Sequence, residues 1–242
     1  MSAPIVISIG STHPWNVAGT GRDLVVATEL RARVFTATAG VTAQDARGLR
    51  AAAAIDPELL AAQLEALPWA AAGAIRVGAL LAAAGVRLVA SALRAHPGTP
   101  AIVDPVFATS RGGSLADDAT RAALALELAI LPNVVLTPNL DEAAVLLGCP
   151  PLERGSIRDA AAALQARGAH AVLLKGGHLQ GDPADAFATA AGVELLSEPR
   201  IAASMRGTGC TLAMAFACEL ARGSELEDAV RSARAYVRLK LA

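Results

Sequence analysis

The chain has 242 residues, of which 54% are apolar, and its formal net charge is −1. This apolar content can offset the entropy of ordering the chain, which excludes an intrinsically disordered protein. The basic residues are spread along the sequence, whereas a nucleic-acid surface needs a concentrated basic face to displace counterions from phosphates. We therefore expect a globular protein that does not bind nucleic acid.

Short apolar runs alternate with longer helical stretches from the N-terminus onward. The first run, Ile5–Ile9, predicts a buried strand, and a loop that contains glycine follows it. Asp56 predicts the N-cap of a helix over Pro57–Leu67. Further runs predict strands over Val34–Ala37, Ala74–Val77, Ala101–Val103, Val134–Leu136 and Ala171–Leu174. The remaining predicted helices span Leu80–His96, Leu115–Ile130, Leu140–Leu147 and Arg158–Arg167, with one more beginning near Gly209 and a last one from Glu225.

The predicted strands are apolar along their whole length, which is typical of strands that are buried on both faces. We therefore predict an α/β fold with a mostly parallel central sheet and helices on both faces. Two short apolar segments flank Ala191 and Gly192, and they predict a β-hairpin at the edge of this sheet. No linker or repeat divides the chain, so residues 1–242 are expected to form a single domain.

Nothing in the sequence predicts export or insertion into a membrane. The N-terminus has no basic segment and too short an apolar run for a signal peptide. The most apolar later stretch, Ala70–Leu93, is interrupted by Arg76 and Arg87, so it is not expected to span a bilayer. The three cysteines show no disulfide spacing, and Cys149 and Cys218 are interpreted as core residues. We expect a cytoplasmic protein.

The segment Gly207-Thr208-Gly209-Cys210 leads directly into an apolar, alanine-rich helix. Backbone N–H groups that converge at such a turn, together with the helix dipole, favour an anion such as a phosphoryl group in transit. The alternative interpretation is a glycine turn that caps a buried helix. Cys210 lies in the first helical turn, where the dipole lowers a thiol pKa, and it could act as a base toward a hydroxyl group. A small core residue is the alternative for this cysteine.

Polar residues also follow three of the predicted strands. Lys175 could balance the charge of a triphosphate, although a solvated lysine at a strand end is the alternative. Asn139 and Glu142 are three residues apart at a helix start, which suits a hydrated Mg²⁺ ion and equally suits an N-cap with a capping box. Asp104 could hydrogen-bond a water on the metal or begin a turn.

Four ordered segments carry a resemblance that extends through nearly the whole chain. They are VDPV (Val103–Val106), LTPNLDEAAVLL (Leu136–Leu147), LLKGGH (Leu173–His178) and GTGCTLA (Gly207–Ala213). Together they resemble the hydroxymethylpyrimidine and phosphomethylpyrimidine kinases of the ribokinase superfamily. The GTGCT sequence is fairly specific, because sugar kinases of this superfamily usually have an aspartate where Cys210 stands.

The resemblance implies a ribokinase-like fold and ATP-dependent phosphorylation of a pyrimidine's hydroxymethyl group, then of the monophosphate. It implies that Cys210 takes the position of the catalytic base and that the anion hole is formed by Gly207, Thr208 and Gly209. Contacts with ATP are implied for Lys175, Asn139 and Thr208. Organisation of Mg²⁺ is implied for Asn139 and Glu142, with Asp104 nearby. Recognition of the pyrimidine is implied for Asp23, Gln44, Ala18, Gly19 and Gly78. Relatives are often dimers, and an exposed hairpin edge is compatible with a homodimer.

The N-terminal loop departs from the family pattern. His13 stands where an aspartate is usual, Trp15 is far larger than the residue expected there, and Asn16 and Val17 replace two glycines. Asp23 is expected in the helix after this loop, and Gln44 in a loop after the second strand. Two alternative functions stay open: a pyridoxal or pyridoxine kinase, and a catalytically weakened paralogue that binds a pyrimidine. A dinucleotide-binding dehydrogenase has little support, because no G-x-G-x-x-G follows the first strand.

Overall fold

A computed structural model describes residues 3–109, 111–176 and 184–242, so Gly177 and His178 of the LLKGGH segment lie outside the described residues. The described strands form one nine-stranded sheet in the order β3-β2-β1-β4-β5-β6-β7-β8-β9. The neighbours in the run from β2 to β7 pair in parallel, whereas β3, β8 and β9 are antiparallel to their neighbours. The strands are β1 (Ile5–Thr12), β2 (Arg33–Asp45), β3 (Gly48–Ala54), β4 (Ala74–Val77), β5 (Ala101–Val103), β6 (Val134–Leu136), β7 (Ala171–Leu174), β8 (Ala184–Thr189) and β9 (Gly192–Ser197).

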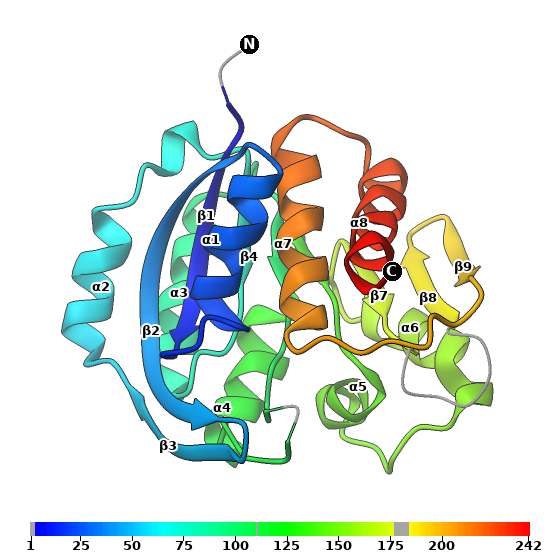
Figure 1. Cartoon of the computed structure of the whole chain (residues 1–242), viewed down its shortest axis with the longest axis horizontal. Coiled ribbons are helices and arrows are strands. Elements are labelled where there is room, and N and C mark those ends of the chain that lie inside the picture. Colours follow the sequence, from blue (N-terminus) through cyan, green and yellow to red (C-terminus); the bar gives the residue numbers. More distant parts are fainter. Residues whose placement is uncertain (1–2, 110, 177–183) are drawn as a thin grey trace.

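Helices cover both faces of the sheet (Figure 1). One apolar core lies between the sheet and α1, α7 and α8, and a second lies between the sheet and α2 to α6. The predicted α/β architecture with an edge hairpin is thereby confirmed. The helices are α1 (Gly19–Glu29), α2 (Pro57–Glu65), α3 (Ala83–Ala95), α4 (Asp118–Ala123), α5 (Leu140–Leu147), α6 (Ile157–Gln165), α7 (Thr208–Ala221) and α8 (Leu226–Leu241).

Local sequence explains where several elements begin and end. The side chain of Asp56 accepts hydrogen bonds from the backbone N–H groups of Glu58 and Leu59, at 2.9 and 3.3 Å, so it caps α2 as predicted. Strands β4, β5, β6 and β7 have the predicted bounds, and every residue in them is buried. Gly192 begins β9 with a φ of 133°, which a residue with a side chain rarely adopts, and thereby closes the predicted hairpin.

The second strand is longer than predicted, and this corrects the placement of Gln44. Strand β2 runs past the end of its pairing with β1 because it forms an antiparallel hairpin with β3, in which Gln44 pairs with Leu49. Gln44 therefore lies within a strand, and its predicted position in a loop is wrong. Strand β3 itself was not predicted, because its residues are mostly exposed alanines, which carry little strand propensity.

Three other predicted features differ in detail. The helix predicted from Leu80 begins at Ala83, since Leu81 adopts a left-handed φ of 62° that interrupts a helix. The helix predicted from Leu115 begins only after Asp117, which caps α4, and it ends in a π-helical turn. Cys149 is partly exposed, so its assignment to the core is wrong, whereas Cys218 is fully buried as predicted. No helix within the described ranges is long and apolar enough to cross a membrane.

Candidate active site

The order in which successive strands join the sheet reverses at β1, which is flanked by β2 on one side and by β4 on the other. In open parallel sheets, ligands bind at such a switch point, beyond the carboxyl ends of the strands. Here Gly10 lies near the end of β1, and Gly78 directly follows β4. The backbone of these two strands can therefore approach a ligand closely, and most of the predicted site residues lie at this end of the sheet.

Side chains of alternating charge form a row across the strands near this switch point. Asp23, on α1, faces the guanidinium of Arg76, on β4, with 3.2 Å between Oδ2 and Nη1. The other guanidinium nitrogen, Nη2, lies 3.6 Å from Oδ2 of Asp104, which follows β5. Nζ of Lys175, which follows β7, donates a 2.8 Å hydrogen bond to Oδ1 of Asp104. Four residues that are far apart in the sequence thus form one connected network.

Arg76 is the centre of this network and is fully buried. Burial alone would lower its pKa, but the carboxylates of Asp23 and Asp104 outweigh burial and raise it, so the guanidinium is charged. Within the described residues, none of its three nitrogens has a well-formed hydrogen bond, so it is held mainly by its ion pairs. A Cβ at Gly78 would lie 2.1 Å from Nη1, so only glycine leaves room for this side chain.

Asp23 and Lys175, at the two ends of this network, differ in their further contacts. Oδ2 of Asp23 also accepts a 2.7 Å hydrogen bond from Oγ of Ser8, and burial raises the pKa of Asp23 despite Arg76 and Ser8. Burial alone would lower the pKa of Lys175, but Asp104 and Glu142 outweigh it and raise the pKa. The Lys175 side chain is only 17% exposed, so it is not a solvated lysine at a strand end.

The predicted turn before α7 packs directly onto this network. Gly207 adopts a left-handed φ of 76°, and a Cβ there would lie 2.0 Å from the carbonyl oxygen of Val17. A Cβ at Gly209 would lie 3.2 Å from Nζ of Lys175 and 3.4 Å from Oδ2 of Asp104. The N-terminal end of α7 therefore lies close to the ammonium group of the lysine and to the Asp104 carboxylate.

Cys210 occupies the first turn of α7, as predicted, and it is buried. Burial raises the pKa of its thiol, and the Arg76 guanidinium opposes this effect while Asp104 and Asp23 add to it. The backbone N–H of Gly19 hydrogen-bonds the sulfur and also favours the thiolate. The sulfur therefore lies among the buried charges, although its pKa is raised and not lowered as helix position alone predicts.

Asn139 and Glu142 form the capping box that was one of the two predicted interpretations. Oδ1 of Asn139 accepts from the backbone N–H of Glu142, and Oε2 of Glu142 accepts from the backbone N–H of Asn139, both at 2.8 Å. Burial raises the pKa of Glu142 to about 7, against the opposing charge of Lys175. Each side chain keeps oxygen acceptors of the kind that Mg²⁺ prefers, so the pair fits a hydrated ion. No cluster of three histidine, cysteine or acidic side chains suited to a metal occurs in the part of the chain that the structure describes.

Gln44, another predicted substrate residue, contacts the arginine that precedes the turn. Nε2 of Gln44 donates to Oγ1 of Thr42 at 3.1 Å, and Oε1 of Gln44 lies 3.4 Å from Nη2 of Arg206, which directly precedes Gly207. The Arg206 guanidinium also lies 5.9 Å from the Trp15 ring centre. Gln44, from the second strand, is therefore connected through Arg206 to the turn that begins at Gly207.

His13, in the altered loop, is buried and organises the residues before α1. The backbone N–H of Ala18 donates to Nε2 of His13 at 3.1 Å. Burial lowers the pKa of His13, and so does the charge of Arg206, which favours the neutral ring that can accept this bond. Ala18 and Gly19 are held in this way beside the turn that contains Cys210, so the loop is ordered despite its unusual sequence.

Sequence reasoning did not find Arg76, Arg206 or Ser8. Arg76 had a usable signal, because it is a charged residue inside a four-residue strand that is otherwise apolar. A charge in that position requires a buried partner of opposite sign. Arg206 and Ser8 carry no comparable signal, since their contacts depend on segments that are distant in the sequence.

Known proteins resemble the chain over most of its length. The profile of the phosphomethylpyrimidine kinase family matches residues 14–242. The hydroxymethylpyrimidine/phosphomethylpyrimidine kinase of Streptomyces coelicolor is 36% identical over 240 residues, which cover 98% of this chain and 88% of the relative. The thiamine biosynthesis bifunctional protein of Geobacter sulfurreducens is 33% identical, over 96% of this chain and 48% of the relative. Among solved structures, the ADP complex of Bacillus subtilis pyridoxal kinase has a TM-score of 0.89 at 26% identity, over 97% of this chain and 90% of the other.

Proposed function

Because the chain belongs to the phosphomethylpyrimidine kinase family, we propose that it phosphorylates 4-amino-5-hydroxymethyl-2-methylpyrimidine, its monophosphate, or both in turn. ATP is the phosphoryl donor, and the reaction serves thiamine biosynthesis. One observation carries the proposal. The Gly207–Cys210 turn lies against Lys175 and Asp104 at the carboxyl ends of the strands, so the N-terminal end of α7 and a lysine are close together. An arrangement of this kind stabilises a phosphoryl group in transit.

In the proposed reaction, the hydroxyl oxygen of the substrate forms a bond to the γ-phosphorus of ATP. The bond from this phosphorus to the bridging oxygen breaks, and ADP leaves. The hydroxyl proton passes to the sulfur of Cys210, whose thiolate is the minor form at neutral pH because burial raises its pKa. Phosphoryl transfer depends mainly on positioning and charge stabilisation, so Cys210→Ser should slow turnover without abolishing it.

The donor side of the reaction is assigned to residues around α5 and α7. Lys175 and the N–H groups of Gly207, Thr208 and Gly209 hold the phosphates. Asn139 and Glu142, with Asp104 nearby, would hold a hydrated Mg²⁺ ion, and the ion would supply positive charge to balance the phosphate oxygens. Glu142 must be ionised for this task, and its pKa of about 7 makes the site sensitive to pH near neutrality.

The acceptor side is assigned to residues of α1, β2 and the loop after β4, on the side of Arg76 away from Lys175. Asp23 and Gln44 are the polar groups that hold the pyrimidine, and Ala18, Gly19 and Gly78 provide small surfaces beside them. The altered loop around His13 is the reason to consider a paralogue with little catalytic activity. Its backbone is held by His13 and lies against the turn at Gly207, which gives this alternative less support. Pyridoxal is the alternative alcohol, and the similarity to a pyridoxal kinase structure makes it the appropriate competitor in an assay.

The experiment incubates the purified protein with Mg-ATP and, separately, the pyrimidine alcohol, its monophosphate, pyridoxal and pyridoxine, and follows the products by mass. Phosphorylated pyrimidine is the expected product. Lys175→Met is the control, because it removes a proposed phosphate contact and should slow transfer to every acceptor. Transfer to a vitamin B6 alcohol alone would overturn the proposed substrate, and failure with all four acceptors would overturn the kinase assignment.

Two further properties belong to the proposal. We place the protein in the cytoplasm, which agrees with its three free cysteines. We also propose a homodimer, as the resemblance implies, and sedimentation of the purified chain tests it directly.

A further inference from the structure

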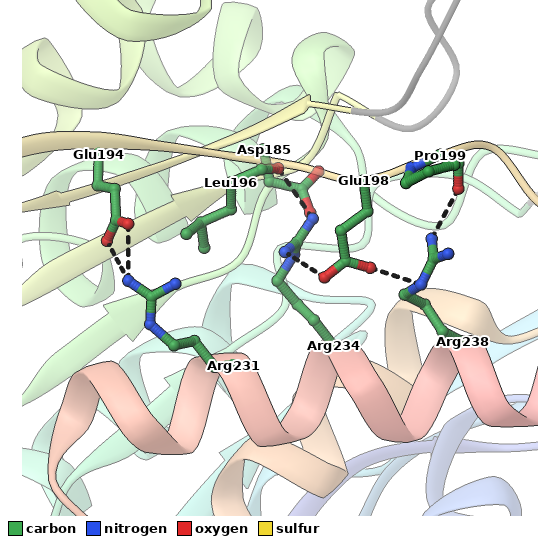
Figure 2. A network of polar contacts seen from close by, with 8 residues as sticks. All are labelled: Asp185, Glu194, Leu196, Glu198, Pro199, Arg231, Arg234 and Arg238. Carbon is green, nitrogen blue, oxygen red and sulfur yellow. Dashed lines mark hydrogen bonds and ion pairs between the residues drawn. The ribbon is translucent and has the colours of Figure 1, made fainter.

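Three arginines on one face of α8 hold the edge hairpin of the sheet (Figure 2). Arg231, Arg234 and Arg238 follow one another at the three- and four-residue spacing that places side chains on one helix face. Arg231 pairs with Glu194 on β9, at 2.6 and 2.8 Å. Arg238 pairs with Glu198 at 2.5 Å and donates to the carbonyl oxygen of Pro199 at 2.9 Å. The C-terminal helix thereby holds the hairpin and the beginning of the segment that leads to the anion-binding turn.

The middle arginine is the most buried of the three and makes the most contacts. Nε of Arg234 lies 2.9 Å from Oδ2 of Asp185 on β8, and Nη2 donates to the carbonyl oxygen of Leu196 at 2.8 Å. Nη1 lies 3.3 Å from Oε1 of Glu198. The side chains of Arg234 and Asp185 are only 10% and 13% exposed, so their bonds are shielded from water.

Asp185 also reaches the end of β7. Its second oxygen, Oδ1, accepts a 2.9 Å hydrogen bond from the backbone N–H of Gly176, the residue after Lys175. On the other side, the backbone N–H of Lys175 donates to the carbonyl oxygen of Pro138 at 2.8 Å. A Cβ at Gly176 would lie 2.1 Å from the carbonyl oxygen of Ala184, so the two segments are in close contact. The backbone that carries Lys175 is therefore fixed by one bond on each side.

We propose that Arg234 is a positioning residue for ATP, which acts through Asp185 and the Gly176 amide to hold Lys175 at the donor phosphates. This inference rests on the proposed role of Lys175. Arg234 fixes the carboxylate of Asp185, the carboxylate fixes the Gly176 amide, and that bond sets the direction in which the chain leaves β7. The pyrimidine residues belong to other segments, so the effect should fall on ATP and spare the alcohol.

The chain offers a matched control on the same helix. Arg231 joins α8 to the same hairpin, but its side chain is 52% exposed and that of its partner Glu194 is 48% exposed. Among the residues that the structure describes, both hydrogen bonds of Arg231 go to the Glu194 carboxylate on β9, which is not bonded to Lys175 or Gly176. Both R231M and R234M remove an ion pair between α8 and the hairpin, whereas only R234M removes the bond to Asp185 and thereby the support of the Gly176 amide.

The experiment compares the wild type, R231M and R234M in two measurements that need no turnover. The first is the Kd of Mg-ATP by calorimetry, which we expect to rise about tenfold in R234M and to stay unchanged in R231M, as for the loss of one bond to a charged group. The second is hydrogen exchange at the Gly176 amide in nucleotide-free protein, which should become faster only in R234M. Where turnover is measurable, the KM for ATP should rise in R234M while the KM for the alcohol stays within about twofold.

Equal ATP affinity in R231M and R234M, or an unchanged Gly176 exchange rate in R234M, would overturn the inference. If R234M does not fold, Asp185→Asn weakens the same bond from the other side, and wild-type ATP affinity in that variant would also overturn it. A wild-type protein that binds ATP but transfers phosphate to no alcohol would count against the proposed function alone, because both measurements remain informative.

Discussion

Two arginine–carboxylate networks in this molecule use the same chemistry in different surroundings. Asp23, Arg76, Asp104 and Lys175 lie below the carboxyl ends of the strands, where Arg76 is fully buried. The α8 network lies on the outside of the sheet, where the Arg231–Glu194 pair is about half exposed. Water and salt screen this exposed pair, whereas the charges of the first network must be compensated within the protein. Buried ion pairs therefore restrain the positions of the site residues more strongly than exposed ion pairs do.

The α8 network itself spans both conditions, which makes the comparison informative. Arg234 is even more shielded than Lys175, at 10% against 17% exposed, whereas Arg231 on the same helix is 52% exposed. The exposed Arg231 has no bond to a residue beside Lys175, whereas the shielded Arg234 is connected to Gly176 through Asp185. Substitution of these two arginines therefore compares an exposed, unconnected ion pair with a shielded, connected one.

The largest effect is expected at the centre of the buried network. Arg76→Met should lower the free energy of unfolding by about 3–5 kcal/mol, because it leaves the carboxylates of Asp23 and Asp104 without their shared counter-charge. Adding Asp23→Asn removes one of these charges and should recover part of the loss. Chemical denaturation of the two variants measures both effects. An exposed ion pair contributes up to about 1 kcal/mol. A loss smaller than this in Arg76→Met would therefore contradict the expected difference between the buried and the exposed network.

A smaller effect is expected from the titration of Glu142. Its pKa rises from 4.5 to about 7 on folding, so the folded state holds more protons than the unfolded state between these values. The contribution of Glu142 to the free energy of unfolding should therefore be greatest below pH 4.5 and decrease by about 1–3 kcal/mol as the pH rises through 7. Glu142→Gln can keep the capping box and removes the titration. The difference in stability between wild type and this variant, measured without Mg²⁺ across pH 4–8, should slope downward, and a flat difference would refute the shift.

The smallest effect is expected at the exposed end of the α8 network. Arg231→Met should lower the free energy of unfolding by less than about 1 kcal/mol, because water screens the pair that it removes. Because salt screens an exposed ion pair, the difference in the free energy of unfolding between Arg231→Met and wild type should become smaller at high ionic strength. Denaturation at low and high salt tests this, and a loss comparable to that of Arg76→Met would remove the distinction between the two networks.

The sequence pattern predicted most of the fold because the elements that matter have strong local signals. Strands β4 to β7 are short, apolar and bounded by polar residues or glycine, and helix α5 starts at a capping box. The β2–β3 hairpin was missed because a run of exposed alanines has neither strand propensity nor alternation. Its absence from the prediction also displaced Gln44 from a strand to a loop.

The sequence indicates candidate site residues one at a time, but it does not indicate which of them contact one another. Lys175 and Asp104 each follow a strand, and nothing local indicates that they pair across 71 positions. Arg76 was passed over because its strand was interpreted as apolar, although it carries the charge on which both carboxylates depend. The order of strands in the sheet brings these residues together, and that order is a property of the whole chain.

The most direct test of the central claim is a competition between two alcohols for one enzyme. Wild-type protein receives limiting Mg-ATP with equal concentrations of the hydroxymethylpyrimidine and pyridoxal, and mass spectrometry gives the ratio of the two phosphorylated products, which equals the ratio of the two kcat/KM values. The account predicts that phosphorylated pyrimidine predominates. Predominant phosphorylation of pyridoxal would contradict it.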